Sequence, residues 1–281
     1  MRLRYLAVSL LFVAAGTAGA QAPRKTTRAG KSPELRVDYI KETLPNGLTV
    51  IYHVDHTTPV AAVLVMYNVG SKMERPAKTG FAHLFEHVMF KGSKNVADGQ
   101  HYALLEAAGG RAGADINGTT SWDRTNYFEQ VPSNQLELGL WLESDRMGTL
   151  TETLTQAKLD NQREVVKNER RQSVDNQPYG SWLEKSEELI YPDSHPYHHS
   201  IIGSMADLSA ASVSDVRSFF KTYYAPNNAV LVLAGDVDVP QANALVRKYF
   251  GPIPRGPAPP RLASMRLPAT IGREQRVVVQ D

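Results

Sequence analysis

The decisive stretch of the sequence is Gly80-Phe81-Ala82-His83-Leu84-Phe85-Glu86-His87-Val88-Met89-Phe90-Lys91-Gly92. It predicts a helix from about Thr79 to Lys91, which Gly92 ends. His83, Glu86 and His87 are spaced i, i+3 and i+4, so they share one face of that helix. The other positions are apolar nearly all round, and this pattern indicates a buried helix.

The shared face of this helix carries the chemistry of a metal site. Side chains at i and i+4 lie about 5–6 Å apart, close enough for two imidazoles to bind one ion. A buried carboxylate such as that of Glu86 is costly without a partner, and a divalent metal with its bound water supplies one. A lone histidine on an apolar helix is more often an ordinary core residue. Two histidines and a glutamate in the order His-x-x-Glu-His form the inverzincin pattern, so the sequence predicts a metal site.

A third protein ligand is expected, because catalytic zinc usually has three. Glu164 and Glu169 compete for this role. Five helical positions place them about 140° apart, so one face of a helix cannot present both. Glu169 lies on the stripe that holds Leu159 and Val166, whereas Glu164 shares a solvated face with Lys167. We therefore predict Glu169 as the third ligand, with Glu164 as the substitute if Glu169 points away.

The composition of the 281 residues narrows the chemistry. There is no cysteine, which excludes disulfides, thiolate zinc sites and cysteine nucleophiles. The apolar content of 42% and the charged content of 21% are typical of a globular protein. Any metal must therefore be held by histidines and carboxylates.

The N-terminus has the layout of a cleavable secretory signal. Arg2 and Arg4 precede an apolar run from Tyr5 to Ala15, and Ala18-Gly19-Ala20 follows it. We expect cleavage after Ala20 and a secreted or periplasmic protein, with no membrane span in the mature chain. Removal of residues 1–20 changes 31 basic and 29 acidic residues into 29 of each. A neutral mature chain gives no electrostatic reason to expect nucleic acid as a partner.

Strand patterns occupy three parts of the chain. Residues 37–68 contain an Asn46-Gly47 turn signal, which predicts a hairpin. Val60 to Val69 is almost wholly apolar and predicts a strand buried on both faces. Further strands are expected within residues 114–131 and 229–234.

Helical periodicity fills most of the remainder. Beyond the first helix, we expect helices at about 99–108, at 133–173 with an interruption near Gly148, and at 180–190, 212–223 and 240–250. The Pro- and Gly-rich residues 251–275 predict a linker. The expected organisation is a signal peptide at 1–20, a flexible tether at 21–36, a catalytic domain at 37–250, this linker, and the start of a second domain at 276–281.

The sequence resembles the M16 (pitrilysin-like) metallopeptidases, a family that includes insulin-degrading enzyme and the mitochondrial processing peptidase. Several separate motifs, spread from about Tyr39 to Phe250, carry the resemblance in the same order along the chain. Besides residues 80–92 they are Ala108-Gly109-Gly110, Asn117-Gly118-Thr119-Thr120, Thr125-Asn126-Tyr127-Phe128, Glu143-Ser144-Asp145-Arg146-Met147, Val165-Val166-Lys167-Asn168-Glu169-Arg170-Arg171, His195-Pro196-Tyr197, Tyr224-Ala225-Pro226-Asn227-Asn228 and Ala234-Gly235-Asp236.

The resemblance implies an α+β fold, with an antiparallel-rich mixed sheet and helices packed mainly on one face. It implies one Zn²⁺ per chain held by His83, His87 and Glu169, with Glu86 as general base. It also implies that a peptide substrate is added as an edge strand beside the segment that includes Asn117. The expected function is that of a zinc-dependent endopeptidase, which hydrolyses peptides or unfolded segments outside the cytoplasm with a metal-activated water.

Three departures from the family pattern keep an alternative open. The gap from His87 to Glu169 is longer than usual, with added residues at 110–114, and Gln162 stands where many relatives carry a glutamate near the metal. Family enzymes also close two homologous halves around the substrate, and the second half supplies an arginine and a tyrosine. We therefore expect a second M16-like domain or subunit, or a homodimer, as partner. The alternative is a metal-binding but inactive half, or a partner subunit, that binds peptides. The histidines of residues 195–199 are interpreted as a surface loop.

Overall fold

The computed structural model describes residues 36–260, 274 and 276–278. The predicted signal segment and nearly all of the predicted tether lie outside the described residues. Residues 276–278 have no regular secondary structure, and the rest of the second-domain start predicted at 276–281 lies outside the described residues as well. Within the described part of the chain, no helix combines the length and the hydropathy that crossing a membrane requires.

Six strands form one mixed sheet in the order β1-β2-β6-β3-β5-β4. Strand β2 pairs with β6 in parallel, and every other pairing in the sheet is antiparallel, as the expected fold class requires. The strands are β1 (Ile40–Thr43), β2 (Thr49–Val54), β3 (Val60–Tyr67), β4 (Ile116–Thr120), β5 (Thr125–Pro132) and β6 (Ala229–Gly235). The hairpin predicted from Asn46-Gly47 is confirmed as the β1–β2 turn. The Asn46 side chain donates hydrogen bonds to the carbonyls of Phe250 and Ile253, which fixes this turn to the end of the last helix.

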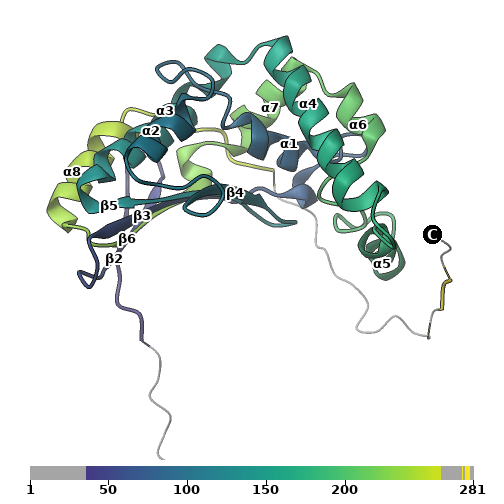
Figure 1. Cartoon of the computed structure of the whole chain (residues 1–281), viewed down its shortest axis with the longest axis horizontal. Coiled ribbons are helices and arrows are strands. Elements are labelled where there is room, and N and C mark those ends of the chain that lie inside the picture. Colours follow the sequence, from purple (N-terminus) through teal and green to yellow (C-terminus); the bar gives the residue numbers. More distant parts are fainter. Residues whose placement is uncertain (1–35, 261–273, 275, 279–281) are drawn as a thin grey trace, which may run out of the picture. The chain divides into compact units, whose positions relative to one another are not determined.

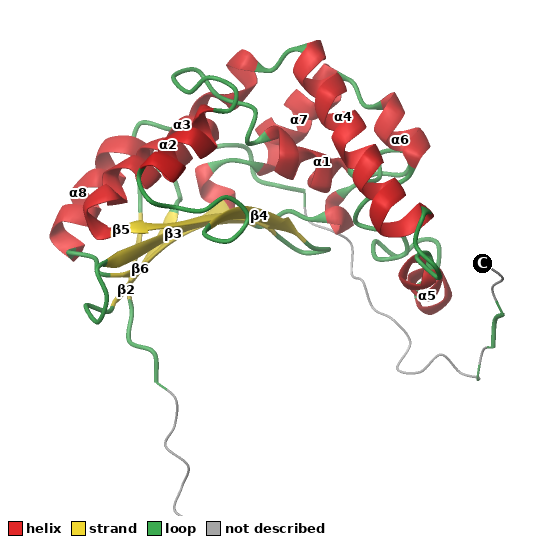
Figure 2. Ribbon diagram, in the orientation of Figure 1, coloured by secondary structure: helices red, strands yellow, loops and turns green. Residues whose placement is uncertain are grey.

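The helices lie against one face of this sheet, as Figures 1 and 2 show. Helix α3 contacts β3, β5 and the last helix, whereas α1 contacts β4, β5 and α4. The helices are α1 (Phe81–Val88), α2 (Gln100–Ala107), α3 (Leu136–Thr153), α4 (Gln156–Arg170), α5 (Trp182–Ile190), α6 (Met205–Ala210), α7 (Val213–Tyr223) and α8 (Val239–Phe250). This arrangement confirms the expected α+β fold with helices mainly on one face.

The structure corrects the prediction for strand β3. Ala61, Val63, Val65 and Tyr67 are fully buried, but the alternate residues of the strand are only half-buried or exposed. The prediction of burial on both faces is therefore wrong. Side chains alternate between the faces of a strand, and the helices cover only one face of this sheet.

A second correction concerns the interruption predicted near Gly148. Helix α3 continues through Gly148 to Thr153, and the chain breaks at Leu154, whose backbone is extended. Thr155 then caps α4, because its side chain accepts a hydrogen bond from the backbone N–H of Lys158. Gly148 instead lies opposite Ile253, whose side chain would be 3.5 Å from an added Cβ.

Aromatic and aliphatic side chains of the core fix the position of α1. The Phe85 ring stacks on Tyr224 with ring centroids 4.4 Å apart, and on Phe220 at 5.6 Å. Leu84 and Val88 are 1% exposed. Burying each such side chain contributes about 1.5–3 kcal/mol, so the apolar side of α1 fixes the direction in which its polar side faces.

Candidate metal centre

Helix α1 begins at a point that only glycine fits. Gly80 has φ +84°, and an added Cβ would lie 2.6 Å from the carbonyl oxygen of Ile202. The buried carboxylate of Glu74 accepts hydrogen bonds from the backbone N–H groups of Gly80 and Ala82, at 2.9 and 2.7 Å. These contacts satisfy N–H groups that the first turn of a helix leaves unpaired, and they fix the position of the helix along its axis.

Two side chains from α1 and one from α4 converge in the space between these two helices. The Nε2 atoms of His83 and His87 lie 3.3 Å apart. The two carboxylate oxygens of Glu169 lie 3.6 Å from Nε2 of His83 and 3.2 Å from Nε2 of His87. Among the residues that the structure describes, this is the group of three or more histidines and carboxylates close enough to hold one ion.

The spacing of these donor atoms fits a tetrahedral ion. Ligands at 2.0–2.1 Å from zinc occupy the corners of a tetrahedron whose edges are about 3.3 Å long. The two histidine nitrogens are 3.3 Å apart, which matches that length, and each has one Glu169 oxygen nearby: Oε1 is 3.6 Å from His83 and Oε2 is 3.2 Å from His87. Two imidazoles and one carboxylate are also a donor set that suits zinc better than magnesium or calcium. The residues present therefore fit a zinc ion with one position left open.

The electrostatics of the group agree with this donor role. Burial lowers the pKa of His83 to about 4, so its imidazole is neutral near pH 7 and its lone pair is free to bind a metal. The hydrogen bond from His87 lowers the pKa of Glu169, which keeps that carboxyl ionised. A metal site needs a neutral imidazole and an ionised carboxylate, and the directions of these two pKa shifts favour those states in His83 and Glu169.

The competing glutamate points elsewhere. Glu164 is exposed and accepts a hydrogen bond at 2.9 Å from Lys167. The buried Gln162 donates its amide to the side chain of Asn161. Helix α4 thus presents Glu169 to α1 and turns Glu164 toward solvent.

Glu86 lies on the same side of α1 as the two histidines, beside the converging group. Burial raises the pKa of Glu86, and a hydrogen bond of 2.5 Å from the Thr120 hydroxyl to its Oε2 opposes that rise. Glu86, His83 and Glu169 line one open cavity of about 470 Å³. Glu86 is therefore a carboxylate beside the candidate metal-binding group, on the wall of an open cavity.

Strand β4 forms one wall of this cavity and the edge of the sheet. It pairs with β5 on one side, and no described strand pairs with its other side. Asn117 lies on this edge strand, where its side chain accepts the N–H of Gly118 and donates to the carbonyl of Gly113. On the side of β4 away from β5, Ile116 forms a single bridge with Ala112, so the edge that is open for an added peptide strand begins beyond Ile116.

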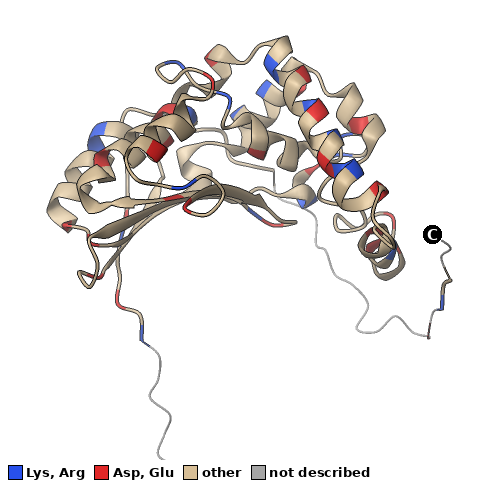
Figure 3. Cartoon of the chain, viewed as in Figure 1, with Lys and Arg blue, Asp and Glu red and all other residues tan. Residues whose placement is uncertain are grey.

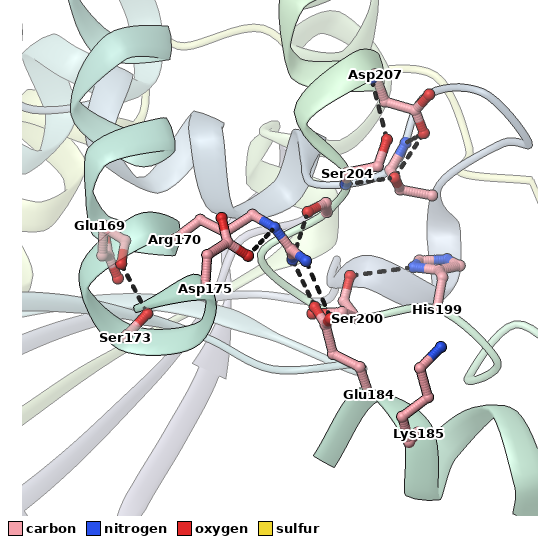
Figure 4. Close-up of polar contacts among 12 residues, drawn as sticks. Glu169, Arg170, Ser173, Asp175, Glu184, Lys185, His199, Ser200, Ser204 and Asp207 are labelled. Atoms are coloured by element: carbon pink, nitrogen blue, oxygen red, sulfur yellow. Dashed lines mark hydrogen bonds and ion pairs between the residues drawn. The ribbon is translucent and has the colours of Figure 1, made fainter. Parts of the chain in front are cut away.

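The sequence reasoning missed two residues near the candidate centre: Arg170, which lines a neighbouring pocket, and Glu187, which lines this cavity. Arg170, next to Glu169, forms ion pairs with Asp175 and Glu184 and donates to the carbonyl of Gly203, so it anchors the end of α4 (Figure 4). Glu187 of α5 lines the cavity with His83, Glu86 and Glu169. It is 5% exposed, and its Oε2 has no hydrogen-bond partner among the described residues. Burial, with repulsion from two neighbouring glutamates, raises the pKa of Glu187 to about 7.

These residues gave little signal in the sequence. The acidic run of α5 has the composition of an ordinary solvated helix, and nothing in its spacing marks Glu187 as buried.

The histidine-rich loop at 195–199 stays apart from the converging group. His198 contacts the carbonyl of Tyr191, and His199 contacts the carbonyl of Ser200. Figure 3 shows Lys and Arg residues interspersed with Asp and Glu residues over the helices.

Comparison with protein families finds two matches along the chain. A model described as Insulinase (Peptidase family M16) matches residues 49–188, which include every residue of the candidate centre. A model described as Peptidase M16 inactive domain matches residues 210–281.

Individual relatives are similar over most of this chain. The Zinc protease PqqE of Helicobacter pylori is 35% identical over 209 residues, which are 74% of this chain and 46% of that protein. The Mitochondrial-processing peptidase subunit beta of Blastocladiella emersonii is 28% identical over 85% of this chain and 49% of its own length. The chain thus spans about half the length of these curated relatives.

Solved structures share the fold. A protease from Helicobacter pylori has a TM-score of 0.73 and 32% identity, over 83% of this chain and 54% of that one. The first half of the periplasmic protease PqqL from Escherichia coli has a TM-score of 0.73 at 24% identity, over 82% of this chain and 49% of that one.

Proposed function

Because the chain belongs to the M16 peptidase family, we propose that it is the catalytic part of a zinc-dependent endopeptidase that hydrolyses peptides or unfolded segments outside the cytoplasm. The observation that carries this proposal is the convergence of His83, His87 and Glu169 beside Glu86 in one open cavity. Relatives of this chain include proteins named as zinc proteases, which supports zinc as the metal.

In this proposal His83, His87 and Glu169 hold one zinc ion. A zinc ion bound there supplies a Lewis acid that lowers the pKa of water and polarises a carbonyl oxygen. Glu86 accepts a proton from the attacking water and delivers it to the leaving amine. The unpaired edge of β4 binds the substrate as an added strand, and Asn117 contacts it there.

The substitution Glu86→Gln tests the catalytic role. It keeps the shape of the side chain but removes the base, so we expect peptide cleavage to fall by at least about 10²–10⁴-fold while zinc content stays at one per chain. Zinc is measured on the purified protein, and cleavage is followed with a quenched fluorescent peptide. A Glu86→Gln protein that cleaves at the wild-type rate, with contaminating protease excluded, would falsify this assignment.

We also propose that a second M16-like half covers the cavity. Helix α5, beside the cavity, exposes an apolar surface: Trp182 is 65%, Leu183 44% and Ile190 54% exposed. An apolar surface of this kind beside a cavity marks a contact for another protein surface. The chain also spans about half of its relatives, which leaves room for such a half.

This part of the proposal predicts slow cleavage by the isolated chain. A missing oxyanion donor costs about 10²–10³-fold in rate, and loss of the covering wall weakens substrate positioning further. Turnover is measured together with the mass of the protein in solution. Rapid zinc-dependent cleavage by a strict monomer of this chain would show that the second half is dispensable.

The proposed location is the periplasm or the extracellular space. It rests on the signal-like residues 1–20 and on the similarity to a periplasmic protease. We propose domain limits at 37–250 for the catalytic domain and 251–275 for the linker. Mass spectrometry of the exported protein tests the predicted start of the mature chain at Gln21. The alternative, a partner subunit without activity, is less favoured because the metal-binding residues and Glu86 are all in place.

A further inference from the structure

Strand β4 touches the Glu86 side chain at two alternate residues. The hydroxyl of Thr120 donates a hydrogen bond of 2.5 Å to Oε2 of Glu86. A Cβ added at Gly118 would lie 3.0 Å from Cγ of Glu86 and 3.2 Å from the Tyr127 ring. Residues 118 and 120 are two apart, so they lie on the same face of the strand. This face therefore offers Glu86 both a hydrogen-bond donor and the space that its side chain fills.

We propose that Thr120 is a positioning residue for the general base and that Gly118 and Thr120 together form a seat for Glu86 on the edge strand. Thr120 acts through Glu86 and is assigned no contact with the metal or the substrate. The inference rests on the proposed function, because Thr120 has this role in catalysis only if Glu86 transfers protons as the general base.

The physical reason lies in the freedom of a glutamate side chain. Glu86 can rotate about three side-chain bonds, and it lies beside three groups that bind a cation. A carboxylate there can turn toward the cation site instead of toward the substrate. The hydrogen bond from Thr120 holds Oε2 and leaves Oε1 for proton transfer. Threonine suits this task because branching at Cβ makes its first side-chain torsion stiff, so the hydroxyl is already oriented.

The neighbours of this seat hold it in place. Thr120 pairs with Thr125 of β5 in the ladder, and the Thr125 hydroxyl donates at 2.9 Å to the carbonyl of Val69. Gly118 pairs with Tyr127, whose side chain is fully buried. Both residues of the seat thus belong to a hydrogen-bonded strand, and a site on a strand is held more accurately than a site on a loop.

The position of the seat has a consequence for catalysis. The same strand that offers its free edge to a peptide also holds the base, so the scissile bond and Glu86 are placed relative to one rigid element. Displacement of a reacting group by about 1 Å can cost about 10²-fold in rate. A change at Thr120 should therefore alter the rate of the chemical step much more than the binding of the peptide.

The test uses two substitutions of Thr120 in the zinc-loaded chain, in the preparation that shows peptide cleavage. Thr120→Val keeps the shape and removes the hydroxyl, whereas Thr120→Ser keeps the hydroxyl. We expect Thr120→Val to lower kcat by about 10–100-fold, since a hydrogen bond to a charged group is lost, with KM and zinc content little changed. Thr120→Ser should restore most of kcat.

A double-substitution cycle separates this role from a structural one. If Thr120 acts through Glu86, then adding Thr120→Val to Glu86→Gln should lower kcat no further than Glu86→Gln alone. A merely structural threonine would lower activity equally in both backgrounds. Gly118→Ala should also lower kcat with zinc retained, because the added methyl group displaces Glu86.

The outcomes for the two proposals are distinct. Wild-type kcat in zinc-loaded Thr120→Val overturns the positioning role and leaves the proposed function intact. If the wild-type chain binds zinc but cleaves no peptide even when a second M16-like half is supplied, the proposed function fails. Crystal structures of the two Thr120 variants then test separately whether Thr120 holds Glu86. If the Glu86 carboxylate occupies the same position in both variants, the inference is overturned. If the carboxylate moves away from β4 in Thr120→Val but not in Thr120→Ser, the inference is supported.

Discussion

Replacement of Glu169 by glutamine tests the candidate ligand that a second helix, α4, contributes to the centre. Glutamine has the same shape as glutamate but no charge, so Glu169→Gln removes the only anion of the three donors. The Glu169 oxygens lie 3.2 and 3.6 Å from the two histidine nitrogens. The side chain is 43% exposed, so its loss should change the free energy of unfolding of the metal-free protein by less than about 1 kcal/mol.

The effect on zinc binding should be much larger. Loss of a residue that merely supports a ligand weakens metal binding by about 10–100-fold, so loss of an anionic ligand should weaken it by about 100-fold or more. At a zinc concentration of about 100 times the wild-type Kd, zinc stabilises the wild-type fold by about 2.7 kcal/mol. The variant would then gain about 0.4 kcal/mol. For a domain of this size, the zinc-induced rise in Tm should fall from about 5–10 °C to about 1 °C.

The assay compares thermal unfolding with and without zinc, and measures Kd by competition with a chelator. Glu164→Gln is the matched control: it removes the same charge from the same helix, at an exposed position paired with Lys167. It should leave Kd and the zinc-induced shift unchanged. Wild-type zinc affinity in Glu169→Gln, or its loss in Glu164→Gln, would refute the ligand assignment.

Two further predictions concern buried charges outside the ligand set. Arg146 is 2% exposed, pairs with the fully buried Glu143 and lies 4.4 Å from the centroid of the Tyr127 ring. The substitution Arg146→Met leaves the Glu143 carboxylate unpaired, so it should lower the free energy of unfolding by about 3–5 kcal/mol. Urea titration measures this change. A loss below about 1 kcal/mol would show that Glu143 does not depend on Arg146. For Glu187, whose pKa burial raises to about 7, the folded state holds a proton that the unfolded chain has lost, so stability falls as the pH rises from about 4.5 to 7. Glu187→Gln should therefore raise Tm more at pH 8 than at pH 4.5, and an equal change at both would contradict the unpaired state of this carboxyl.

Much of the local structure could be predicted because it depends on neighbours in the sequence. The apolar positions of residues 81–90 require a buried helix, and helical spacing alone then places His83, Glu86 and His87 on one face. The same argument separates Glu169 from Glu164, because two residues five apart cannot share a helix face. The hairpin at Asn46-Gly47 follows from turn chemistry in the same way.

Other features depend on contacts between distant segments. Helix α3 continues through Gly148 where it faces Ile253, a residue more than a hundred positions later in the chain. The half-exposed face of β3 follows from the placement of the helices on one side of the sheet. Neither is encoded in a local pattern, so propensity and periodicity gave the wrong answer at both places.

The sequence by itself determined the identity of the candidate donors, their helix and the face on which they lie. Only the tertiary structure decided that α4 brings the Glu169 carboxylate within 3.2–3.6 Å of two imidazoles, and that Thr120 and Gly118 of β4 hold Glu86. The physical reason is that a helix fixes the spacing of its own side chains through local hydrogen bonds. The approach of α4 and β4 to α1 depends instead on burial of apolar surface across segments about 30–80 residues apart in the chain.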